Sequence, residues 1–124
     1  MKHILIVDSN LGFLYWLGET LAEANHQPWP ACNIAEAGAM LRSRRLPSLD
    51  LLIVNPSVEG ASRFIHRLRR TRPELKVLAV DPVNEKQVRG VTAWRARPSG
   101  DDLSAKHQWL RHIERVISEH QRAA

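Results

Sequence analysis

The sequence predicts an α/β fold, a doubly wound sheet of five parallel strands with helices on both faces. Strand-like and helix-like patterns alternate five times along the chain. Residues 51–54 form a short, continuous apolar run that stops at Asn55-Pro56, as expected of a central strand covered on both faces. The 124 residues, 44% hydrophobic and 25% charged, suit one packed domain over residues 1–124, and we expect no output domain.

The first strand and helix are predicted from an apolar run followed by capping residues. Ile-Leu-Ile-Val at 4–7 is closed by Asp8. Ser9 and Asn10 offer side-chain oxygens that can cap a helix starting at Leu11. The apolar residues of this helix recur at intervals of three and four, at Leu14, Leu17, Leu21 and Ala22.

Two prolines and a capping box define the next strand and helix. Pro28 and Pro30 flank Trp29, so a strand here must be short or lie at an edge, because proline donates no ladder hydrogen bond. Asn33 and Glu36 have capping-box spacing, and the helix that follows should end in the arginine-rich run at 42–45.

The second half of the chain contains three further strand patterns, at 49–54, 77–80 and 92–96. A helix beginning at Ser57 or Gly60 has its apolar stripe at Ala61, Phe64, Ile65 and Leu68. A weak, short helix is expected at 83–89. The last helix, capped by Asp101 or Asp102, has its stripe at Leu103, Leu110, Ile113 and Ile117.

Polar residues follow four of the predicted strands. They are Asp8 with Ser9, Asn55, Asp81 and Arg97. Because functional groups of parallel α/β sheets gather beyond the carboxyl ends of the strands, we expect these side chains to meet in one pocket.

These motifs resemble the receiver domains of two-component response regulators. The resemblance rests on Ile-Leu-Ile-Val-Asp at 4–8, Asp-Leu-Leu-Ile-Val-Asn-Pro at 50–56, and the stretch 90–98, with Trp94 at the place of an aromatic switch residue. It covers nearly the whole chain. It implies a CheY-like, flavodoxin-like sheet of strand order 2-1-3-4-5 and a role in bacterial two-component or phosphorelay signalling. The segment from Asp81 to Arg97 is shorter than the family usually has, so we expect a short or irregular fourth helix.

The resemblance also implies Mg²⁺-dependent phosphoryl transfer to an aspartate, but this sequence departs from the family at most of the positions involved. Asn55 occupies the phosphoacceptor position, and Asp8 with Ser9 the acidic pair. Asp81 stands at the hydroxyl position and Arg97 at the lysine position. An amide has no anionic oxygen to attack phosphorus, and Mg²⁺ prefers charged oxygen ligands. We therefore expect a degenerate phosphorylation pocket without catalysis, metal or cofactor.

Arg97 has two possible roles in this pocket. Its guanidinium can bridge Asp8, Asp81 or both with forked geometry, so that an internal ion pair replaces the metal and phosphoryl group. In the simpler interpretation Arg97 points to solvent.

An aromatic patch near the C-terminus suggests a partner surface. On a helical wheel Trp109 and Val116 lie on the flank of the Leu103-Leu110-Ile117 stripe, and Trp94 lies on the preceding strand. In receivers the face formed by the fourth helix, fifth strand and fifth helix binds partners or a second copy, and tryptophan is enriched at interfaces. The alternative is that Trp109 completes the core.

The net charge of +5 and pI of about 10.1 raise the alternative of a nucleic-acid or polyanion-binding domain. Its arginines would form an edge at the helix ends, at Arg42, Arg44, Arg45, Arg67, Arg69, Arg70 and Arg72. Solvated cations that complement helix dipoles are the simpler explanation, so we consider nucleic acid the weaker hypothesis. A residual phosphoacceptor is the other alternative.

The remaining features indicate a cytoplasmic protein. The N-terminal apolar run is four residues long, too short for a signal peptide or a membrane span. Cys32 is the only cysteine and the six histidines lack metal-ligand spacing. We expect a non-enzymatic signalling module that acts through a protein partner or as a homodimer.

Overall fold

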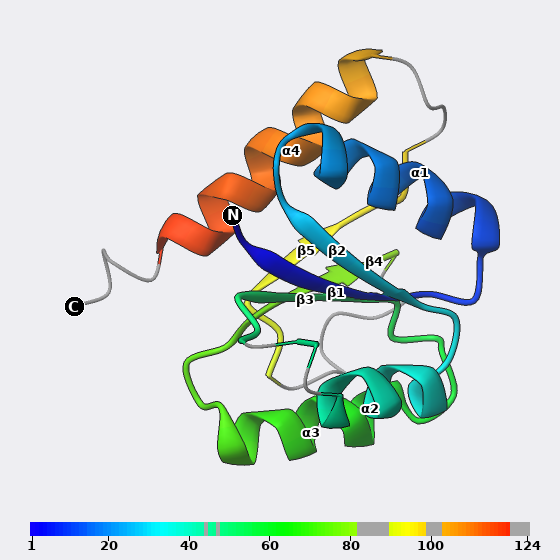
Figure 1. Ribbon diagram of the computed structural model, residues 1–124, viewed down its shortest axis with the longest axis vertical. Coiled ribbons are helices and arrows are strands. Elements are labelled where there is room, and N and C mark those ends of the chain that lie inside the picture. The colour runs from blue at the N-terminus through cyan, green and yellow to red at the C-terminus, as the bar shows by residue number, and fades with distance from the viewer. Residues whose placement is uncertain (44, 47, 82–89, 99–102, 120–124) are drawn as a thin grey trace.

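Figure 1 shows a computed structural model of the protein, which describes residues 1–43, 45–46, 48–81, 90–98 and 103–119. Five parallel strands form one sheet of order β2-β1-β3-β4-β5. The strands are β1 (His3–Val7), β2 (Gln27–Ala31), β3 (Leu51–Val54), β4 (Lys76–Val80) and β5 (Ala93–Arg95). The helices are α1 (Leu11–Glu23), α2 (Ile34–Arg42), α3 (Ala61–Thr71) and α4 (Leu103–Ser118). The predicted fold class and strand order are confirmed.

The helices cover the sheet in two layers, α1 with α4 on one face and α2 with α3 on the other (Figure 1). All four residues of β3 are fully buried, and this strand lies between β1 and β4 at the centre of the sheet, as predicted. The helix expected at 83–89 lies outside the described residues. Of the helices that are described, none combines the length and apolar character needed to cross a membrane.

The prolines of β2 fall where they cost no hydrogen bond of the sheet. Gln27 donates its N–H to the carbonyl of Lys2, just before β1, and the carbonyl of Ala31 accepts from the N–H of Asp8, just after β1. Alternate residues of a strand point their backbone groups to opposite sides, so Pro28 and Pro30 lie on the outer edge of β2. The outer edge therefore lacks donors at these positions, which disfavours pairing with another strand.

Side-chain caps set the starts of α1 and α2. Asn10 Oδ1 accepts from the N–H of Phe13 at 2.9 Å. Asn33 Oδ1 accepts from the N–H of Glu36 at 2.8 Å, as the predicted capping box requires. Glu36 Oε1 in turn accepts from the N–H of Cys32 at 2.8 Å. In the usual capping box it would accept from the N–H of the cap residue, here Asn33.

The predicted orientation of the last helix is wrong. Trp109 and Val116 are each only 1% exposed, and together with Ile113 they form the stripe that packs towards α1. Leu110 and Ile117 are only half-buried. Because the buried stripe is centred on position 109 instead of 110, the helix is rotated about its axis by about 100° relative to the prediction. The aromatic rings account for this rotation, because Trp109 packs edge-on against Phe13 and Trp16 with centroids 5.5 and 6.3 Å apart.

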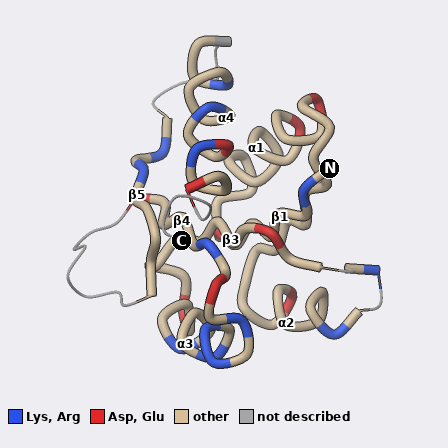
Figure 2. The backbone as a smooth tube through the Cα atoms, turned by 90° about the vertical axis from the view of Figure 1, so that its left-hand side faces the viewer, with Lys and Arg blue, Asp and Glu red and all other residues tan. Residues whose placement is uncertain are grey.

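Charge is divided unequally between the two helical layers. Helices α2 and α3 together contain five arginines and one glutamate, a formal net charge of +4. Helices α1 and α4 contain three cations and three glutamates, so their net charge is zero. Figure 2 shows Lys and Arg gathered along α3, on the layer opposite α1 and α4.

Burial of His26 should make stability depend on pH. Neither ring nitrogen has a hydrogen-bond partner among the residues that the structure describes, and burial is the main cause that lowers its pKa below 6.5. Because the folded pKa lies below the unfolded one, the stability is fully present above about pH 6.5. It is lost as the pH falls through the lowered folded pKa. We expect the melting temperature to fall between about pH 7 and pH 5.

A variant isolates this effect. His26→Gln keeps a neutral polar side chain. Its melting temperature should fall less over the same pH interval than that of the parent protein. His66→Gln, on the exposed surface of α3, is the control for loss of an imidazole. An equal pH slope in the parent and in His26→Gln would contradict the prediction.

Candidate functional site

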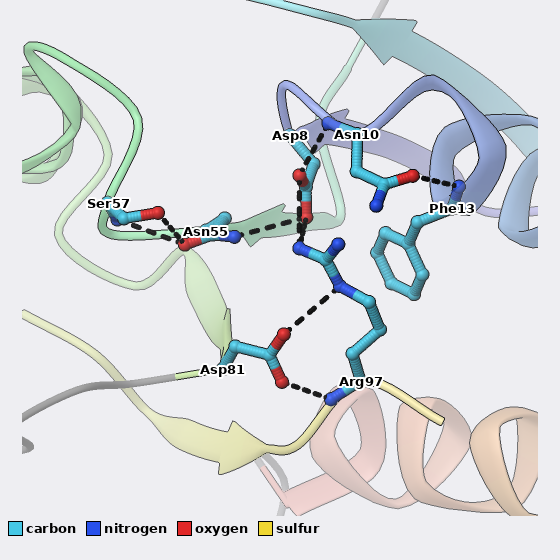
Figure 3. A network of polar contacts seen from close by, with 7 residues as sticks. All are labelled: Asp8, Asn10, Phe13, Asn55, Ser57, Asp81 and Arg97. Atoms are coloured by element: carbon cyan, nitrogen blue, oxygen red, sulfur yellow. Dashed lines mark hydrogen bonds and ion pairs between the residues drawn. The ribbon is translucent and has the colours of Figure 1, made fainter. Parts of the chain in front are cut away.

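Four polar residues meet beyond the carboxyl ends of the strands (Figure 3). Asp8 directly follows β1, Asn55 follows β3, Asp81 follows β4, and Arg97 lies two residues after β5. Parallel strands bring these positions to one edge of the sheet. The predicted convergence of these four residues is therefore observed.

Asp8 is the buried anion of this pocket, with 1% of its surface exposed. Its Oδ1 accepts from the backbone N–H of Asn10 at 2.9 Å, and its Oδ2 accepts from Asn55 Nδ2 at 3.4 Å. Arg97 Nη2 lies 3.0 Å from Oδ2 and 3.3 Å from Oδ1. A buried carboxylate costs much free energy unless it is paired and hydrogen-bonded, and Asp8 is both.

Two residues orient the side-chain amide of Asn55. The backbone N–H and the hydroxyl of Ser57 both donate to Asn55 Oδ1, at 3.0 and 2.7 Å. The opposite side of the amide donates to Asp8. An aspartate in this position would place a second carboxylate against Asp8, so the amide suits its neighbours electrostatically.

Arg97 joins the two carboxylates of the pocket. Besides its contact with Asp8, its Nε lies 3.0 Å from Asp81 Oδ2, and its backbone N–H donates to Asp81 Oδ1. The guanidinium carbon lies 5.2 Å from the centre of the Phe13 ring, within reach of a cation–π interaction. The hypothesis that Arg97 bridges both aspartates is confirmed, and the alternative in which it points to solvent is wrong.

The backbone of Asp81 places its carboxylate beside Arg97. Asp81 has a φ of 49°, in the left-handed region, which aspartate adopts more readily than most residues with a side chain. Its N–H donates to the carbonyl of Arg95 at 3.0 Å and so continues the pairing of β4 with β5. This turn holds Asp81 against the residues that follow β5.

The oxygen atoms of this pocket do not fit the binding site for Mg²⁺ that the receiver resemblance implies. Both oxygens of Asp8 contact Arg97, and Asn55 Oδ1 is taken by Ser57. Within the described parts of the chain, no group of three or more His, Cys, Asp or Glu residues is arranged to hold a metal ion. A guanidinium in contact with the buried carboxylate also repels a cation.

Sequence reasoning did not anticipate the roles of Phe13 and Ser57. It also expected the Ser9 side chain to join the pocket, which no contact among the described residues supports. Phe13 lies in the first turn of α1, where its ring can contact Arg97. The Asn55-Pro-Ser57 spacing, typical of a local side-chain turn, could have indicated the contact with Ser57. Ser9 is exposed, and its hydroxyl has no hydrogen bond to the described residues.

Solved structures show what this architecture is similar to. The chain matches a CheY-like response regulator receiver domain protein from Methanospirillum hungatei over 100% of its length and 99% of that chain, with a TM-score of 0.78 and 19% identity. The protein described in Figure 1 therefore has the receiver-domain fold. A response regulator from Thermotoga maritima matches at a TM-score of 0.73 and 20% identity, covering 95% of this chain and 98% of that one. No protein-family model and no curated protein sequence matches the chain.

Of the three residues predicted to form an interface, only Trp94 remains a candidate. Trp109 and Val116 are buried and cannot contact a partner without unfolding. Trp94 is half-buried, and it alternates along β5 with Ala93 and Arg95, which pack on the α4 side. The side chain of Trp94 is therefore directed to the other face of the sheet.

The predicted arginine edge is only partly available for binding. The Arg69 side chain donates to the carbonyls of Pro73, Leu75 and Gly90 and to the hydroxyl of Thr92. Burial lowers the pKa of its guanidinium. Arg69 thus holds the end of α3 to the segments before β4 and β5. Arg44 lies outside the described residues, and the other five arginines are exposed, at Arg42, Arg45, Arg67, Arg70 and Arg72.

Proposed function

We propose that this chain is a pseudo-receiver, a receiver-like module that is not phosphorylated and acts by protein–protein contact in a two-component or phosphorelay pathway. The observation that supports this most strongly is the Arg97 bridge, since one guanidinium contacts both carboxylates of the pocket. The fold favours signalling over catalysis, because the similar solved structures are response regulator receiver domains. We also propose that the protein is bacterial and cytoplasmic.

Two physical arguments favour the loss of phosphoryl transfer. Asn55 offers a neutral amide where the resemblance implies an anionic nucleophile, and that amide is held by Ser57 and Asp8. Arg97 already supplies Asp8 with a positive partner, so an incoming metal would have to displace an ion pair with a contact of 3.0 Å. Both changes favour one fixed arrangement of the pocket over a switch.

Intact-mass spectrometry tests this proposal directly. After incubation with acetyl phosphate and Mg²⁺, we expect the protein to retain its original mass. We expect the same of Asn55→Asp, because Arg97 would still occupy Asp8. A stable phosphoryl adduct on the parent chain would overturn the proposal, and fragmentation would then locate the acceptor. An adduct on Asn55→Asp alone would mean that the pocket has lost only its nucleophile.

A further inference from the structure

A groove between α2 and α3 lies on the positively charged layer of the molecule. Its volume is about 430 Å³. Its apolar lining includes the half-buried Ile34 and Leu41 and the buried Phe64 and Leu68, and Arg42 and Arg67 lie at its border, both exposed. The groove therefore combines an apolar floor with cations on both helices, away from the pocket around Arg97.

Arg67, which lines this groove, and two further arginines of α3 have no carboxylate partner among the described residues. Arg63, Arg67 and Arg70 are spaced by four and three residues on α3, so they lie on one side of the helix and repel one another. Among the described residues, ion pairs form between Arg97 and Asp8, Arg97 and Asp81, and Lys106 and Glu23, and none involves these three arginines. Carboxylates from outside the chain would relieve this repulsion.

Gly38 keeps the groove open on the α2 side. Glycine in a helix interior is unfavourable, and a Cβ at this position would lie 3.2 Å from Arg42 Nη1. The missing side chain allows the guanidinium of Arg42 to lie back over the helix. Arg42, although exposed, thus places its Nη1 beside Gly38 at the groove.

We infer that the α2–α3 groove docks an acidic, amphipathic segment of a protein partner. Apolar side chains at helical spacing would fill the groove, and carboxylates beside them would pair with Arg42 and the arginines of α3. A nucleic-acid backbone matches the charge but leaves the apolar floor without a partner, so a protein segment suits the groove better. This inference rests on the proposed role as a protein-interaction module and names its surface and partner chemistry.

Fluorescence anisotropy with synthetic probes tests the inference on the full chain. The main probe is a labelled helical peptide of about 16 residues with leucines at i, i+3, i+4 and i+7 and glutamates between them. Comparison probes replace the leucines with serine or the glutamates with lysine, and a duplex DNA tests the nucleic-acid alternative. We expect the Glu/Leu peptide to bind more tightly than all three.

Matched variants locate the binding site. Arg67→Glu should weaken binding about tenfold by reversing a border charge, whereas Arg111→Glu on exposed α4 should not change it. Gly38→Leu should fill the groove and abolish binding while retaining the melting temperature, because leucine favours a helix more than glycine. Gly18→Leu, at an open position on α1, is the matched control.

Several results would overturn the inference. They are no binding of the Glu/Leu peptide at low salt, equal binding of the Glu/Ser peptide, tighter binding of DNA, or equal effects of the groove variants and their controls. None of them depends on the phosphorylation experiment, because that experiment measures phosphoryl transfer at the carboxyl edge of the sheet. Failure of the docking inference and failure of the pseudo-receiver proposal can therefore be distinguished.

Discussion

Replacing Trp109 with alanine is expected to lower the free energy of unfolding by about 3–5 kcal/mol, the usual cost of removing a buried tryptophan. The side chain is 1% exposed and packs edge-on against Phe13 and Trp16. It also lies under the guanidinium of Arg95, whose carbon is 5.5 Å from the ring. The truncation leaves a cavity between α1, α4 and β5 and removes the cation–π contact.

Thermal and urea unfolding measure this effect, with Trp94→Ala as the matched control. Trp94 is half-buried, so we expect its truncation to cost about 1 kcal/mol, near the average for single substitutions. The Trp109 variant should melt roughly 10–20 °C below the parent, given a few degrees per kcal/mol for a chain of this size. Equal losses for the two variants would indicate that Trp109 is not a core residue.

Replacing Arg97 with alanine is expected to destabilise the protein by about 2–3 kcal/mol. The substitution leaves the carboxylate of Asp8, 1% exposed, without its cation and beside Asp81. Breaking a fully buried pair costs about 3–5 kcal/mol, and we expect less because the Arg97 and Asp81 side chains are 25% and 39% exposed. Arg111→Ala, on the exposed side of α4, should change stability by less than about 0.5 kcal/mol.

A double-mutant cycle separates the ion pair from other losses. In an Asp8→Asn background the buried charge is gone, so Arg97→Ala should cost less than it does in the parent. We expect a coupling energy of about 1–2 kcal/mol between the two positions. Additive effects, or an unchanged melting temperature of Arg97→Ala, would mean that the bridge contributes nothing to stability.

Much of the fold and pocket was predictable because the signals are local. Asn10 and Asn33 cap the helices that their positions indicated. Placing charged residues after parallel strands raised the contact of Arg97 with one or both aspartates as one of two possibilities, and the structure shows both contacts. The rotation of α4 was not predictable in the same way, since Leu110 and Trp109 both continue a helical stripe. The choice between them depends on Phe13 and Trp16, far away in the sequence.

The sequence alone determined the alternation of strands and helices, the short or edge character of β2 and the chemistry of the pocket residues. These depend on the backbone preferences and side-chain types of short segments, which neighbouring residues set. Only the tertiary structure decided that Trp109 is buried, that Arg69 is bound to three carbonyls, and that a groove separates α2 from α3. Each of these depends on contacts between segments distant in the chain, which no local pattern encodes.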